Sequence, residues 1–169
     1  MLVGRPSILA MLALLVGSCA TVPTAGSVSP LVGTWSLQNR IDRQADGREF
    51  IEPSLGRDPI ALLIYDSKGN VSAQLMRRDR SQPERQALTN ADPNNSAAQG
   101  GYDAYFGTYF VSGNTVTHVL HAALNSKDVG RRLTRNFRLE SGRLVIYYAA
   151  READGTQVTR TLTWQRSAP

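Results

Sequence analysis

Cysteine is nearly absent from this 169-residue sequence, which has only Cys19, and histidine is almost as rare, with His118 and His121. Because Cys19 lies so close to the N-terminus, the remainder of the chain can form no disulfide and no thiolate metal site. The two histidines stand three residues apart in a predicted strand and face opposite sides, so they cannot easily share a zinc ion. No Walker loop, dinucleotide-binding fingerprint or G-x-S-x-G elbow follows a predicted strand. We therefore expect neither a metal nor a cofactor.

Charge of one sign is not concentrated in any segment. The net charge is +5, from 19 Lys and Arg against 14 Asp and Glu, but the arginines are scattered and aromatic residues make up 7%. This pattern is typical of a solvated surface, and we expect no nucleic-acid partner. Asp42, Asp46 and Asp58 lie beside predicted turns, where short acidic side chains accept hydrogen bonds from backbone amides, and they show no metal-ligand spacing.

Long apolar runs are also missing. The longest, Ile8–Val16, is shorter than the roughly 20 residues that cross a bilayer. Preceded by Arg5, it has the length and flank of the apolar region of a signal peptide. The overlapping residues Leu15-Val16-Gly17-Ser18-Cys19 resemble the lipobox of bacterial lipoproteins. This resemblance implies cleavage before Cys19 and a diacylglycerol on its thiol; an ordinary cleaved signal and an uncleaved anchor are the alternatives.

The lipobox divides the chain into three parts. We expect residues 1–18 to be a signal peptide, residues 19–30 to hold the lipidated cysteine and a flexible tether, and residues 31–166 to form one domain. Ala20, and not aspartate, follows the cysteine. By resemblance to sorting in enteric bacteria, this implies an outer-membrane lipoprotein of the cell envelope that faces the periplasm. The lipid would attach the protein to the membrane, and the oligomeric state stays open.

The domain consists of short runs rich in Val, Ile, Leu, Tyr and Thr, separated by turn sequences such as Lys68-Gly69-Asn70 and Ser141-Gly142. Eight or nine antiparallel strands in sequence order predict an all-β fold, a single up-and-down barrel able to hold one small ligand. The predicted strands are Gly33–Arg43, Ile60–Tyr65, Val71–Arg77, Tyr105–Val111, Thr115–Leu124, Arg131–Glu140, Arg143–Ala150 and Gln157–Gln165, with an extra strand near Arg48–Glu52.

One polar insertion, residues 79–101, interrupts this pattern. It contains Pro83, Pro93 and two adjacent asparagines, and one short helix is predicted at Gln82–Leu88. Long loops of this kind often serve as lids or binding loops, and plain disorder is the alternative.

A series of short stretches spans nearly all of the domain: Leu31–Leu37, Asp58–Asp66, Val71–Arg77, Tyr105–Tyr109, Val116–His118, Asn125, Val129-Gly130, Arg135–Phe137 and Leu162–Trp164. In combination they resemble the bacterial lipocalin-like domain proteins, within the wider lipocalin and fatty-acid-binding-protein group. The resemblance implies a β-barrel with a central cavity, but no single activity. The long loop around Asn90–Gly100 and the pair Arg131-Arg132 depart from the family pattern at the mouth of the cavity.

Alternation along the strands points four polar side chains into the predicted lumen. His118, on a face with Ala122, is either a structural histidine bonded to a tyrosine or carbonyl, or a ligand-binding or acid–base group. Arg135 needs either a buried partner or the carboxylate or enolate of a ligand. Tyr105 and Tyr109 share one face of the neighbouring strand, as core tyrosines or as catalytic groups.

The resemblance also implies a structural role for Trp35. In lipocalins a tryptophan of the first strand closes one end of the barrel beneath an arginine of the last strand, here Arg160 or Arg166. We expect Arg160, because alternation points it inward, and we expect barrel closure without a role in function.

Three hypotheses of different classes follow. The first is a binding module for a small apolar or amphipathic molecule, whose polar end is fixed by Arg135, His118 and the tyrosines; the small inward residues Gly107 and Ala122 are consistent with a roomy lumen. The second is a cofactor-independent isomerase, cyclase or hydrolase in which His118 moves a proton. The third is a structural or assembly lipoprotein whose barrel is filled, with residues 79–101 as the contact surface.

Overall fold

The computed structural model describes residues 1, 29–81, 94–152 and 154–167. The predicted lipobox with Cys19 and the predicted helix Gln82–Leu88 lie outside these residues.

The described residues form nine strands and one short 3-10 helix, η1, at Ser126–Asp128. The strands follow the alternating apolar runs, and glycines with positive φ occupy the turns between them, as at Gly69 and Gly142. The strands are β1 Gly33–Arg43, β2 Glu49–Phe50, β3 Ile60–Tyr65, β4 Asn70–Met76, β5 Tyr102–Ser112, β6 Thr115–Ala123, β7 Arg132–Glu140, β8 Arg143–Arg151 and β9 Gln157–Arg166.

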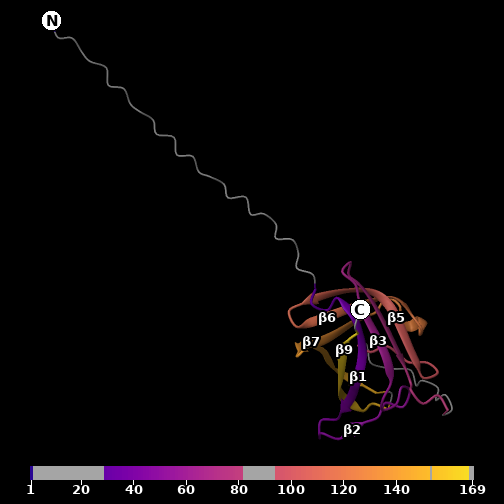
Figure 1. Ribbon diagram of the computed structural model, residues 1–169. Helices are drawn as coiled ribbons and strands as arrows, with labels where there is room; N and C mark the ends of the chain where they lie inside the picture. The colour runs from indigo at the N-terminus through magenta and orange to yellow at the C-terminus, as the bar shows by residue number, and fades with distance from the viewer. Residues whose placement is uncertain (2–28, 82–93, 153, 168–169) are drawn as a thin grey trace.

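The sheet closes on itself (Figure 1). Strands β3 to β9 are antiparallel neighbours in sequence order, and β1 completes the cylinder by pairing with both β3 and β9. The ninth strand, β2, adds only two pairs at the end of β1. The prediction of an up-and-down barrel of eight strands with one extra strand is therefore confirmed.

The two ends of the barrel differ. The tight hairpins β3–β4, β5–β6 and β7–β8 lie at one end, and the longer loops lie at the other, which we call the mouth. At the hairpin end Trp35 is fully buried and its indole Nε1 donates to the Leu31 carbonyl at 2.8 Å. The guanidinium over this ring belongs to Arg166, 4.2 Å from the ring centroid. The expectation that Arg160 closes this end is wrong, because Arg166 is the register partner of Trp35 and Arg160 lies opposite Asp42 near the mouth.

A β-bulge between β5 and β6 changes which side chains face the lumen. Gly107 pairs with Leu120 and Phe106 with Ala122, so His121 is the extra residue. Ala123, beside Tyr105, consequently faces the core, and the prediction that Ala122 faces inward is wrong. A Cβ at position 107 would lie 1.9 Å from the Val119 carbonyl oxygen, so this bulge requires glycine.

Candidate functional site

A cavity of about 310 Å³ occupies the mouth half of the barrel. This volume is at the lower end of the range for small-molecule sites. Trp164 belongs to the apolar wall, and its indole N–H is buried without a hydrogen-bond partner among the described residues. The apolar wall is formed by Phe50, Leu55, Leu63, Ala73, Leu75, Ile146, Leu162 and Trp164.

His118 lies in the cavity wall and is 2% exposed. Its Nε2 is 2.8 Å from the Tyr65 hydroxyl and its Nδ1 is 2.9 Å from the Tyr105 hydroxyl. Burial, together with the positive charge of Arg135, lowers its pKa from 6.5 to about 3, so the imidazole is neutral. Because both ring nitrogens are engaged by tyrosines, this geometry matches the structural role among the predicted alternatives and offers no free general base.

Arg135 points into the same cavity from β7 and is 5% exposed. Its guanidinium lies over the Tyr148 ring, 3.7 Å from the centroid. Its Nη1 donates to Asn94 Oδ1 at 2.8 Å and to the Thr134 carbonyl at 3.3 Å. In the part of the chain that the structure describes, no carboxylate forms an ion pair with it. The cation is therefore held in place by neutral groups.

The two predicted tyrosines lie at different depths. Tyr105 lines the cavity, whereas Tyr109 is not part of its wall. The Tyr109 hydroxyl donates to the Asp66 carbonyl at 3.1 Å, and its ring packs edge-on against Tyr65 at 4.7 Å, toward the hairpin end. The structure thus brings together His118, Arg135 and Tyr105 and leaves Tyr109 in the core.

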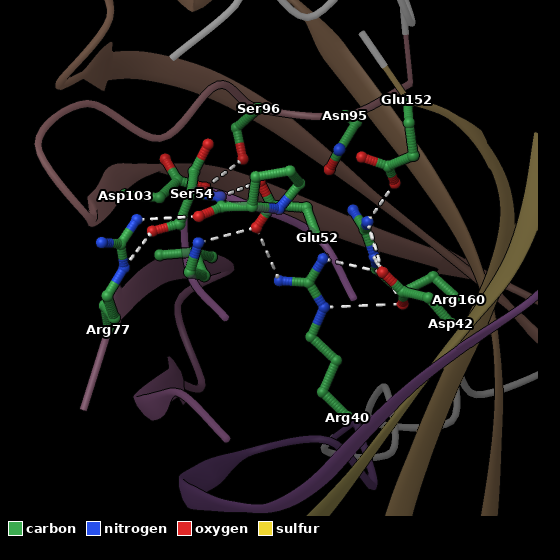
Figure 2. A network of polar contacts seen from close by, with 12 residues as sticks. Arg40, Asp42, Glu52, Ser54, Arg77, Asn95, Ser96, Asp103, Glu152 and Arg160 are labelled. Atoms are coloured by element: carbon green, nitrogen blue, oxygen red, sulfur yellow. Dashed lines mark hydrogen bonds and ion pairs between the residues drawn. The ribbon is translucent and has the colours of Figure 1, made fainter. Parts of the chain in front are cut away.

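A buried ion network also borders the cavity, through Arg40, Glu52, Glu152 and Arg160 (Figure 2). Asp42 accepts from Arg160 Nη2 at 2.7 Å and from Arg40 Nη2 at 2.9 Å. Glu152 pairs with Arg160, and Glu52 Oε2 lies 3.5 Å from Arg40 Nη1. Burial disfavours the Asp42 carboxylate, but its bonds to both arginines and their charges outweigh this and hold its pKa below the usual value.

Sequence reasoning missed this network, and it placed Asp42 at a turn. A register shift in β1 between Leu37 and Asn39 explains the error. Strict alternation from Trp35 points Asp42 to solvent, whereas the irregularity turns both Arg40 and Asp42 inward. The sequence signal that could have found them is the unusual Arg-x-Asp spacing inside a strand opposite Arg160.

Loop residues cover the mouth from two sides. Glu52 accepts from the backbone N–H groups of Ser54 and Leu55 at 2.7 and 2.8 Å, which folds residues 52–55 against the cavity (Figure 2). Ser96 Oγ donates to Asp103 Oδ2 at 2.6 Å, and the Ala97 amide donates to buried Asp128 at 2.8 Å. The end of the predicted insertion is thus part of the cavity wall.

Asp103 is a buried acid at this mouth. Burial and the charge of Asp128 outweigh its bond to Ser96 and the charge of Arg135, and raise its pKa from 3.8 to about 6. Across the described residues there is no group of three or more His, Cys, Asp and Glu side chains placed to hold a metal ion. Within the same residues, no helix has the length and apolar character needed to span a membrane.

One family model covers most of the chain. The model of the lipocalin-like domain family matches residues 32–167, and the chain belongs to this family. No curated protein matches the chain. Among solved structures, it is similar to the zebrafish ileal bile acid-binding protein complexed with cholic acid, with 14% identity and a TM-score of 0.38 over 80% of this chain and 98% of that chain.

Proposed function

We propose that this protein binds a small amphipathic molecule, with its apolar body against the cavity wall and an acidic head group at Arg135. The observation that carries the proposal is the buried guanidinium of Arg135, which forms no ion pair with a carboxylate among the described residues. By contrast, Arg40 and Arg160 in the same cavity are already paired with carboxylates.

A buried cation without a directly paired carboxylate is costly, and a ligand carboxylate or enolate in the cavity supplies that pair. The planar guanidinium fork matches such a group well. Stacking on Tyr148 fixes the plane of the guanidinium before a ligand arrives, so less conformational freedom is lost on binding. The apolar wall, which includes Ile146 and Leu162, contacts the remainder of the molecule.

Replacing Arg135 by methionine is expected to weaken the binding of decanoic acid about 10- to 100-fold and to leave decanol binding within about twofold, since a hydrogen bond to a charged group contributes more than a neutral one. Isothermal titration calorimetry measures both, and Trp164 in the cavity wall gives a fluorescence readout. Arg132→Met, an exposed arginine on the same strand, is the matched control. Equal losses for acid and alcohol would contradict the assignment of Arg135.

The ligand itself is identified by mass. Native mass spectra of the protein purified from its own cells are compared with denaturing spectra, and a small acidic molecule that is lost on unfolding supports the binding function. A protein that carries no ligand, and that binds neither decanoic acid nor an apolar fluorescent probe, would overturn it in favour of a filled barrel.

We also propose that the protein is an envelope lipoprotein anchored through Cys19, on the strength of the lipobox-like sequence before it. Cys19→Ser is expected to abolish incorporation of labelled palmitate and to move the protein from the membrane fraction to the soluble fraction. Both are measured in cells by autoradiography and fractionation. Unchanged labelling in the variant would contradict the anchor.

A further inference from the structure

The contacts of His118 define the direction of a hydrogen-bond chain. Its two ring nitrogens are each within 2.9 Å of a tyrosine hydroxyl, from Tyr65 and Tyr105. A neutral imidazole has one N–H donor and one acceptor nitrogen. One tyrosine must therefore donate to the ring, and the other must accept from it and direct its own hydroxyl hydrogen elsewhere.

The surroundings of the two tyrosines differ. Tyr65 is 1% exposed, does not line the cavity, and its hydroxyl has no other hydrogen-bond partner in the described ranges. If Tyr65 accepted from His118, its own hydrogen would be buried without an acceptor, which is costly. Tyr105 lines the cavity, where the oxygen of a bound molecule can accept from it.

We propose that Tyr65 donates to Nε2 of His118, that His118 is consequently the Nδ1–H tautomer and donates to Tyr105, and that Tyr105 directs its hydroxyl hydrogen into the cavity. His118 is then a positioning residue, and Tyr105 is the residue that requires an acceptor oxygen on the ligand.

The charges nearby support this assignment. Burial raises the pKa of Tyr105 well above its usual value despite the nearby charge of Arg135, so the phenol keeps its hydrogen and acts as a donor. Because bonds in such a chain polarise one another, the donation from His118 strengthens the Tyr105 hydroxyl as a donor. On the basis of the proposed function, the ligand is then an oxygen acid whose head group contacts both Arg135 and Tyr105.

The tautomer is measured directly by long-range ¹H–¹⁵N correlation spectra of the full chain. Exposed His121 is replaced by glutamine, so that His118 is the only histidine. The expected spectrum shows a protonated Nδ1 and an acceptor Nε2. A protonated Nε2, or an equal mixture of the two tautomers, would overturn the proposal whether or not any ligand binds.

Ligand binding is the second measurement, with decanoic acid as the probe. Tyr105→Phe is expected to weaken the binding of decanoic acid about tenfold and to leave the binding of an apolar fluorescent probe unchanged. Tyr109→Phe is the matched control, because Tyr109 lies on the same strand and its hydroxyl donates to the Asp66 carbonyl outside the cavity. This variant should bind both molecules as the unmodified protein does. Equal affinities in the two variants would contradict the role of Tyr105. If the unmodified protein binds no decanoic acid, the proposed function fails, and the spectrum alone decides the tautomer.

Discussion

Replacing Asp42 by asparagine is expected to lower the free energy of unfolding by about 3–5 kcal/mol. Asp42 is 3% exposed and lies between the guanidinium groups of Arg40 and Arg160. Without its charge, Arg40 is paired with Glu52 alone and Arg160 with Glu152 alone. Burial disfavours the charged form of both glutamates. Among the described residues, Asp42 is the carboxylate that pairs with both arginines, and breaking these two buried ion pairs is far more costly than the loss of an exposed ion pair.

The measurement is urea-induced unfolding at neutral pH, followed by circular dichroism. Asp46→Asn is the matched control. Asp46 lies only four residues after Asp42, and its ion pair with Arg48 is exposed. Its unfolding curve should be nearly the same as that of the unmodified protein. If both variants unfold at the same urea concentration, the network does not stabilise the barrel as its burial implies.

Two buried groups are expected to give the stability of the protein opposite dependences on pH. The pKa of His118 falls from 6.5 to about 3 on folding, so its contribution is full above pH 6.5 and is lost as the pH falls toward 3. The pKa of Asp103 rises from 3.8 to about 6, so its contribution is full below pH 3.8 and is lost as the pH rises through 6. Between pH 4 and 6 the two opposite changes in the free energy of unfolding with pH largely cancel.

Asp103→Asn separates the two contributions, because asparagine keeps an oxygen that accepts from Ser96 and cannot ionise. Relative to the unmodified protein, the variant is expected to gain up to about 3 kcal/mol between pH 4 and 7, corresponding to the interval from 3.8 to about 6. Urea-induced unfolding at closely spaced pH values measures this difference. At pH 4 the two proteins should unfold alike, and a difference that is constant with pH would contradict the raised pKa of Asp103.

Local sequence patterns were sufficient to predict the barrel and three of its cavity residues. Turn sequences marked the strand ends, and alternation pointed Tyr105, His118 and Arg135 inward, as the structure shows. Alternation fails where a strand gains a residue, which is why the inward positions of Asp42 and Ala123 were missed.

Two other features depend on distances that periodicity does not contain. Alternation gives the face of a side chain but not its depth in the barrel, so it could not separate Tyr109 from Tyr105. The docking of the mouth loop depends on partners far along the chain: Asn94 bonds to the backbone of Thr134, and Ala97 bonds to Asp128. Such pairings are set by tertiary packing alone.

The chain enters and leaves the barrel at the same end. Arg166 donates to the carbonyl oxygens of Pro30 and Val32, and the Ser167 amide donates to the Thr34 carbonyl at 2.8 Å, so the segment that leads into β1 and the segment that follows β9 are joined at the hairpin end. A sensor chip or a fused reporter attached directly before residue 30 or directly after residue 167 therefore holds the barrel by its closed end. The mouth lies at the other end of the barrel from such an attachment, so molecules can enter and leave the cavity while the protein stays immobilised.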